Sequence, residues 1–191
     1  MANVNAPRGF IPRRHMSGRS IVQNKYTIAS GYSTSLFMGD RLILSGTSNN
    51  VNIAVGTAGT PSVAGIGVFA GCEWTDSAGV YHFSSYWPAS TVSADAVAFV
   101  WDDPDIIFEV QSANFALNDI GALVDFTYAA GSTKTGMSGC YLDSTTGTSD
   151  KSFRLLGLVD RPDNAVGAYA KVECLCIEHA LRGVIAGVGG V

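Results

Sequence analysis

The chain has 191 residues, of which 47% are hydrophobic and only 15% are charged. This composition excludes intrinsic disorder over most of the chain, and it excludes a coiled coil, which needs many charged residues in a heptad pattern. The net charge of −4 is unevenly divided, because residues 1–25 hold five basic residues and no acid, which leaves −9 for residues 26–191. So few charges on the body favour burial of its surface in a symmetric oligomer or a larger assembly.

Residues 1–25 are predicted to form an extended basic arm. Pro7 and Pro12 prevent a continuous helix and favour an extended path, which could reach on the order of 80 Å. Phe10 and Ile11 offer isolated apolar anchors within the basic sequence. We therefore divide the chain into an arm at residues 1–25 and a β-rich domain at residues 26–191.

From Tyr26 onward, short apolar or alternating runs are broken by turn-forming residues at intervals of about 8–15 residues. This spacing is typical of an all-β fold, here a single β-sandwich, jelly-roll-like or barrel domain behind an extended N-terminal arm. Residues 112–123 are the one helix candidate, and the glycine-rich residues 183–191 are expected to be mobile or docked on a neighbour. The strands are predicted at residues 26–28, 36–44, 52–55, 65–72, 80–84, 96–101, 106–111, 122–128, 139–142, 153–159 and 168–177.

The motifs of catalysis are weak throughout the chain. Residues 131–136 suggest a phosphate loop but lack the lysine directly after the last glycine, so a β-turn is favoured. Residues 65–70 suggest a dinucleotide fingerprint but lie in a strand pattern, where glycines allow close packing or a bulge. His15, His82 and His179 have no sequence pattern that ties them to a serine or cysteine nucleophile. We therefore predict no enzyme activity, no catalytic residue and no cofactor.

The clustered aspartates and the cysteines are expected to serve the fold, as turn residues and buried side chains. Asp102, Asp103 and Asp105 surround Pro104 and favour a turn between two strands, with a cation site as the alternative. The four cysteines lack zinc-ligand spacing and are expected to be small buried hydrophobic residues in a protein of the reducing cytosol. No signal peptide or bilayer-spanning run is predicted. The cysteines are Cys72, Cys140, Cys174 and Cys176.

The order of several short motifs along the chain resembles one family of virion proteins. Residues 2–15 read ANVNAPRGFIPRRH, and Ser17-Gly18 follows them. Together with the motifs named next, this opening resembles the head decoration, or capsid cement, proteins of tailed bacteriophages. The further motifs are Gly39-Asp40, residues 67–71, Tyr86-Trp87-Pro88, Asp102-Asp103-Pro104, residues 108–111, Asp163-Asn164 and His179.

The resemblance implies a noncatalytic virion structural protein, made in the host cytoplasm, that decorates the outer surface of an HK97-type capsid. Such proteins stabilise the shell by fastening adjacent major capsid protein subunits, and many are homotrimers. A trimer would present three arms, and each successive arm would bind at a high effective concentration. We expect no membrane partner, and the acidic body argues against nucleic acid as a partner because it would repel it.

The arm is the predicted partner-binding site. Pro7, Phe10, Ile11 and Pro12 are expected to supply shape and apolar anchoring, while Arg8, Arg13, Arg14 and Arg19 are expected to pair with carboxylates of the shell. Deleting residues 2–25 is then expected to abolish capsid binding and leave the body folded.

Two other functions stay open. Trp74, Trp87 and Trp101 suggest a carbohydrate-binding or enzymatic virion module, although a core or interface position is favoured for each. The basic arm also fits an inner capsid or tail component that contacts DNA.

Overall fold

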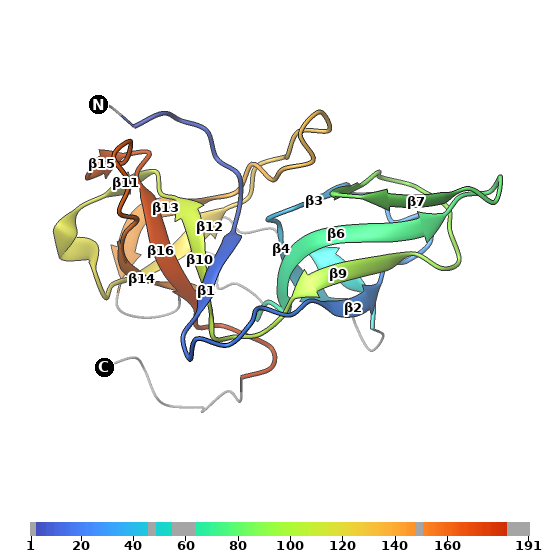
Figure 1. The fold of residues 1–191 in the computed structure, drawn as a ribbon, viewed down its shortest axis with the longest axis horizontal. Coiled ribbons are helices and arrows are strands. Elements are labelled where there is room, and N and C mark those ends of the chain that lie inside the picture. Colours follow the sequence, from blue (N-terminus) through green and yellow to red (C-terminus); the bar gives the residue numbers. More distant parts are fainter. Residues whose placement is uncertain (1–2, 46–48, 55–63, 148–150, 183–191) are drawn as a thin grey trace.

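The computed structural model describes residues 3–45, 49–54, 64–147 and 151–182. In these residues every regular element is a β-strand, apart from the 3-10 turn η1 at Leu117–Asp119. The predicted all-β fold is therefore confirmed. The strands form two large antiparallel sheets that lie side by side along the long axis of the molecule (Figure 1).

Sheet B is built mainly from the first half of the chain and has the strand order β2-β9-β6-β4-β5, with β7 also paired to β6. Its core includes Leu42, Phe69 and Trp87, none of which is exposed. The short strands β3 and β8 pair with each other beside it. The bounds are β2 Asn24–Thr27, β3 Leu36–Phe37, β4 Arg41–Leu44, β5 Val51–Ile53, β6 Gly67–Thr75, β7 Tyr81–Ser84, β8 Tyr86–Trp87 and β9 Val97–Trp101.

Sheet A takes one strand from the N-terminal segment and the rest from the second half of the chain, in the order β1-β10-β16-β14-β12-β13. The N–H of Ala113 donates to the carbonyl of Leu142 at 2.8 Å, which joins the end of β10 to β13 and curls the sheet like a barrel. A small sheet of β11 and β15 lies beside it. The bounds are β1 Ile11–His15, β10 Ile106–Gln111, β11 Asn114–Phe115, β12 Leu123–Thr127, β13 Tyr141–Gly147, β14 Phe153–Leu158, β15 Gly167–Ala168 and β16 Lys171–Cys176.

Arg41 joins the two sheets. This buried residue of β4 donates to the carbonyl of Glu178 at 2.6 Å, and its guanidinium lies 4.9 Å from the ring centre of Phe153 in sheet A. A Cβ on Gly65 would come within 2.4 Å of Nε of Arg41, so this glycine makes room for the arginine. The close-packing role predicted for the glycines of residues 65–70 is thus confirmed.

The predicted strands agree with the observed strands over most of the described chain. The turn at Asp102–Asp105 and the turn at residues 131–136 are both confirmed, and β6 has a bulge between Phe69 and Gly71. The helix predicted at residues 112–123 is wrong, because that segment supplies β11, η1 and the start of β12. Its backbone groups bond to neighbouring strands, as when Ser112 N–H donates to Ala170 at 2.8 Å. The expectations for Val55 and residues 183–191 lie outside the described residues.

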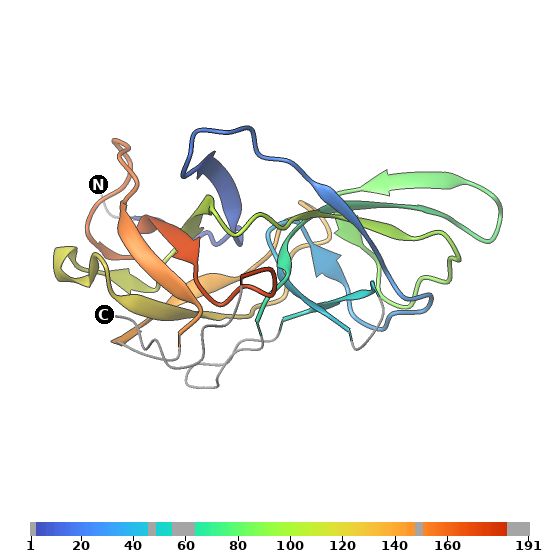
Figure 2. The same ribbon diagram turned by 90° about the horizontal axis from the view of Figure 1, so that it is seen from below.

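The N-terminal segment differs most from its prediction. Residues 11–15 form β1 within sheet A, and the predicted boundary at residue 25 falls inside β2 of sheet B. Figure 2 shows the connection that runs from β1 in one sheet to β2 in the other. The chain from residue 10 onward is therefore part of the folded body, because an edge strand that pairs with β10 satisfies its own backbone and buries Phe10.

Candidate functional site

Phe10 fixes the N-terminal segment to sheet A. Its ring is fully buried, stacks on Phe153 with centroids 4.5 Å apart, and meets Phe126 edge to face at 5.9 Å. The preceding Gly9 has a φ of +69°, and a Cβ there would lie 2.4 Å from the carbonyl oxygen of Gly39. Glycine is thus required where the segment enters the core.

Strand β1 continues from Phe10 along the edge of sheet A. Ile11 lies opposite Glu109 and His15 lies opposite Ile106, with an irregularity between Pro12 and Arg14. Proline is tolerated on such an edge strand because its missing N–H removes no interior ladder bond. The strand brings the basic residues of the segment over the acidic residues of β10 and β16.

Two glutamates occupy the centre of this surface. Glu109 of β10 and Glu173 of β16 are direct cross-strand partners, and Glu109 is only 5% exposed. Like charges directly opposite each other destabilise a sheet, and burial of an unpaired carboxylate costs several kcal/mol. The pair therefore requires cations close by.

Arginines supply those cations. Glu109 accepts hydrogen bonds from Arg8 at 3.1 Å, from Arg13 at 3.3 Å and from Arg161 at 2.6 Å. Arg13 Nε also lies 3.0 Å from Glu173, so this one guanidinium bridges both carboxylates. The fixed fork of donors on an arginine makes such bridging favourable.

The surface carries more positive than negative charge. Arg14 donates to Glu173 at 2.8 Å. The arginine cluster is thus four arginines around two glutamates, a surplus of two positive charges. The side chain of Arg14 is 54% exposed and that of Arg8 is 47% exposed, so both guanidinium groups keep donors that face solvent. The cluster comprises Arg8, Arg13, Arg14, Arg161, Glu109 and Glu173.

The turn that follows β9 holds the next part of the segment. Asp103 accepts a hydrogen bond from Nε2 of the buried His15 at 3.0 Å, because the N–H of Ser17 donates to the other ring nitrogen. The backbone N–H of Asp105, and after it His15, lower the pKa of Asp103. Arg19 lies 4.0 Å from the same carboxylate and is exposed.

The three aspartates of this turn do not form one cation site. Asp102 is buried and accepts hydrogen bonds from Asn24 at 2.9 Å and from Tyr26 at 2.8 Å. Burial and this hydrogen bond raise the pKa of Tyr26. Asp105 instead pairs with Arg182.

His15, Asp103 and Asp105 bring ligand atoms within 4.8 Å of one another, and in the described residues they are the one group with this metal-like geometry. Each of the three already has a protein partner.

The predicted partner-binding residues thus fall into two groups. Phe10 faces its own core and offers no surface to a partner in this conformation, which corrects its predicted role as an external anchor. Pro7, Ile11 and Pro12 are half-buried. The exposed group comprises Arg8, Arg13, Arg14 and Arg19.

Sequence reasoning missed the intramolecular partners of the arginines. Glu109 and Gln111 lie on the same face of β10, but nothing in the sequence pattern of the strand indicates that the N-terminal segment covers this face. Arg161 lies in a turn and reaches Glu109 across 52 positions of the chain, which no local motif reveals.

The remaining histidines and two of the three tryptophans make contacts within the fold. His82 stacks on Trp74 at 5.0 Å and pairs with Asp76 at 2.8 Å. His179 is buried, and burial lowers its pKa to about 4. Trp74 and Trp87 are in the core of sheet B, so neither is free to form a sugar platform. The four cysteine thiols are free and buried, as predicted.

No family model, curated protein or solved structure matches this chain. In the part of the chain that the structure describes, no helix has the length and hydropathy needed to cross a bilayer.

Proposed function

We propose that the chain is a noncatalytic virion structural protein that decorates the outer surface of a phage capsid. It stabilises the shell by fastening adjacent major capsid protein subunits, and it acts as a homotrimer. The order of motifs in its sequence supports this proposal, because it resembles that of capsid cement proteins.

The arginine cluster is the observation that carries the proposal. Its six side chains hold a surplus of two positive charges on the outer face of sheet A, with Arg8 and Arg14 half-exposed. The glutamates beneath fix the guanidinium groups in place, which lowers the entropy that a partner must remove on binding. Such a preorganised surface fits carboxylates on an acidic protein shell.

The charge of the whole chain favours a protein partner over DNA. Residues 26–191 carry −9, and this charge opposes binding to duplex DNA more strongly than binding to an acidic protein surface, because DNA has the higher density of negative charge. A trimer would present three such clusters from one rigid centre, so weak contacts would add to firm attachment. Selective binding to the assembled shell would then shift the equilibrium between free and assembled capsid subunits toward the assembled shell.

Cosedimentation with capsids of the same virion that lack this chain tests the proposal. The full chain should sediment with the capsids, and the double variant Arg8→Gln, Arg14→Gln should lose most of that binding. Lys134→Gln is the matched control, since Lys134 is an exposed cation in the turn at residues 131–136, outside the cluster. Equal binding by the double variant and the control would refute the role of the cluster.

The same purified protein also tests the alternative that the chain binds DNA. Tight binding of the full chain to duplex DNA, with an affinity that falls steeply as salt increases, would favour an inner capsid or tail component instead.

A further inference from the structure

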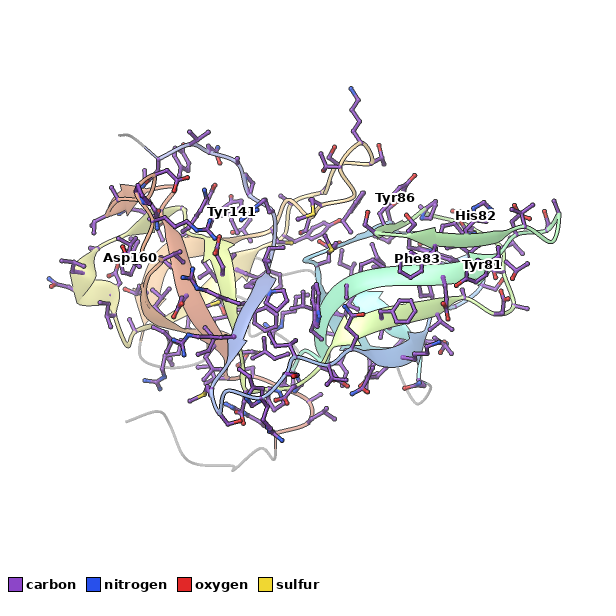
Figure 3. All side chains as sticks on the ribbon, in the orientation of Figure 1. Tyr81, His82, Phe83, Tyr86, Tyr141 and Asp160 are labelled. Carbon is purple, nitrogen blue, oxygen red and sulfur yellow. The ribbon has the colours of Figure 1, made fainter. Side chains whose placement is uncertain are left out.

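A cavity of about 410 Å³ lies at the end of sheet A, under the N-terminal segment. This volume falls in the range of about 300–1,000 Å³ that small-molecule sites occupy. Tyr141 lies beside the N-terminal segment at this end of the sheet (Figure 3). The lining residues are Asn5, Pro7, Gln111, Ala113, Ala129, Ala130, Gly139, Tyr141 and Tyr169.

Among the residues that the structure describes, no Lys, Arg, His, Asp or Glu lines the cavity. A charged ligand would lose its hydration there without gaining an opposite charge. The alanines and the two tyrosine rings supply apolar surface, so a suitable ligand is neutral and has an apolar face.

Hydrogen-bonding groups are held in place on one side of this cavity. Gln111 is only 5% exposed, accepts from the N–H of Ala6 at 2.9 Å and donates to Asn5 at 2.8 Å. One N–H of Gln111 and the amide nitrogen of Asn5 have no partner among the described residues, and the same holds for the hydroxyls of Tyr141 and Tyr169. The cavity therefore offers several groups that could bond to hydroxyls of a ligand.

Tyr169 adds an independent observation. Its φ is +60°, a left-handed conformation that glycine and asparagine adopt far more readily than tyrosine. Holding a non-glycine residue there costs about 1 kcal/mol or more. Its N–H donates to the carbonyl of Ala113 at 3.2 Å, so the backbone is fixed; the residue lines the cavity and is 40% exposed overall. A tyrosine kept at this cost indicates that its ring is used.

We propose that this cavity binds a neutral pyranose sugar unit. A pyranose has an apolar C–H face, which suits stacking on a tyrosine ring, and a rim of hydroxyls, which suits the amides and phenols around it. A proline-rich peptide is the alternative ligand, because a proline ring also has an apolar face. Each proline offers only one carbonyl for hydrogen bonding, so such a peptide would leave most of the polar groups of the cavity unused. The site does not depend on the arginine cluster or on the proposed capsid role.

Saccharide binding by the full chain tests the site. Isothermal titration calorimetry would be run with methyl glycosides of glucose, galactose, mannose and N-acetylglucosamine, and with neutral oligosaccharides built from them. At least one should bind with a dissociation constant below about 5 mM. Binding of the methyl glycosides would show that a single unit suffices, and binding of oligosaccharides alone would show that a longer surface glycan is recognised; both support the site.

Tyr169→Gly is the decisive variant, because it removes the ring and also relieves the unfavourable φ. Its melting temperature should match or exceed that of the wild type, while sugar affinity should fall at least about tenfold. Tyr81→Ala is the control, since Tyr81 is exposed at the far end of sheet B (Figure 3) and should leave sugar binding unchanged.

Three results would overturn the proposal. They are no binding of any saccharide at about 10 mM, unchanged affinity in Tyr169→Gly, or binding of a polyproline peptide in place of every sugar.

Discussion

Replacing Phe10 by alanine tests whether the N-terminal segment belongs to the folded body. The ring is fully buried and packs against three other phenylalanines, including Phe153 at 4.5 Å and Phe126 at 5.9 Å. Removing a phenylalanine ring from a packed core costs about 3–5 kcal/mol, through lost transfer free energy and the cavity left behind. We expect Phe10→Ala to lower the free energy of unfolding by about 4 kcal/mol.

Urea denaturation, followed by tryptophan fluorescence and circular dichroism, measures this change. With a slope of about 2 kcal/mol per molar, the midpoint should fall by about 2 M. Phe83→Ala is the matched control, since Phe83 is 71% exposed and should cost less than about 1 kcal/mol. A loss below about 1 kcal/mol in Phe10→Ala would mean that the segment is not held in the core, and the free-arm prediction would regain its support.

Three further predictions test the electrostatics and the burial of titratable groups. Glu109→Gln should cost about 1–2 kcal/mol in urea denaturation, because it removes the charge of a buried carboxylate that pairs with three partly exposed arginines. Arg14→Ala, at the exposed rim, should cost less than about 1 kcal/mol, and equal costs would contradict a buried centre. Burial raises the pKa of Asp40 to about 6 and lowers that of His179 to about 4. As the pH falls from 7 to 4.5, Asp40 stabilises the folded state, because its carboxylate takes up a proton more readily there than in the unfolded chain. His179 has the opposite effect, because its ring takes up a proton less readily in the folded state than in the unfolded chain. Asp40→Asn removes the gain, so its stability should fall more steeply on acidification than that of the wild type, and parallel pH profiles would count against this coupling. Finally, burial raises the pKa of all four cysteine thiols, to about 12 for Cys72 and Cys140. None of these thiols should therefore react with a neutral disulfide reagent until urea unfolds the protein. Rapid labelling in buffer without urea would show that the core is open to the reagent.

The strands of the body were predictable because their signals are local. Ile106, Phe108 and Val110 occupy every second position of residues 106–111, and these three side chains all face the core of sheet A, while Glu109 and Gln111 lie on the other face. Asp102–Asp105 was recognised as a turn from Pro104 and its flanking aspartates.

The docking of the N-terminal segment was not predictable in the same way. Phe10 lies among prolines and arginines that favour an extended chain, and the segment is extended, but its partners Phe153 and Glu109 are about a hundred or more positions away in sequence. The segment becomes strand β1 because Phe10 packs in the core of sheet A, its backbone pairs with β10, and Glu109 and Glu173, which meet across β10 and β16, require the arginines. Deletion of residues 2–25 is accordingly expected to expose this core and unfold sheet A, which replaces the expectation of a folded truncated body.

The location of the chain in the intact virion tests the proposed function most directly. A reconstruction of the particle should show density for this chain on the outer surface of the capsid, with Arg8 and Arg14 of the arginine cluster within about 4 Å of carboxylates on the shell. Density inside the shell or on the tail, or an arginine cluster that faces only solvent, would contradict the account.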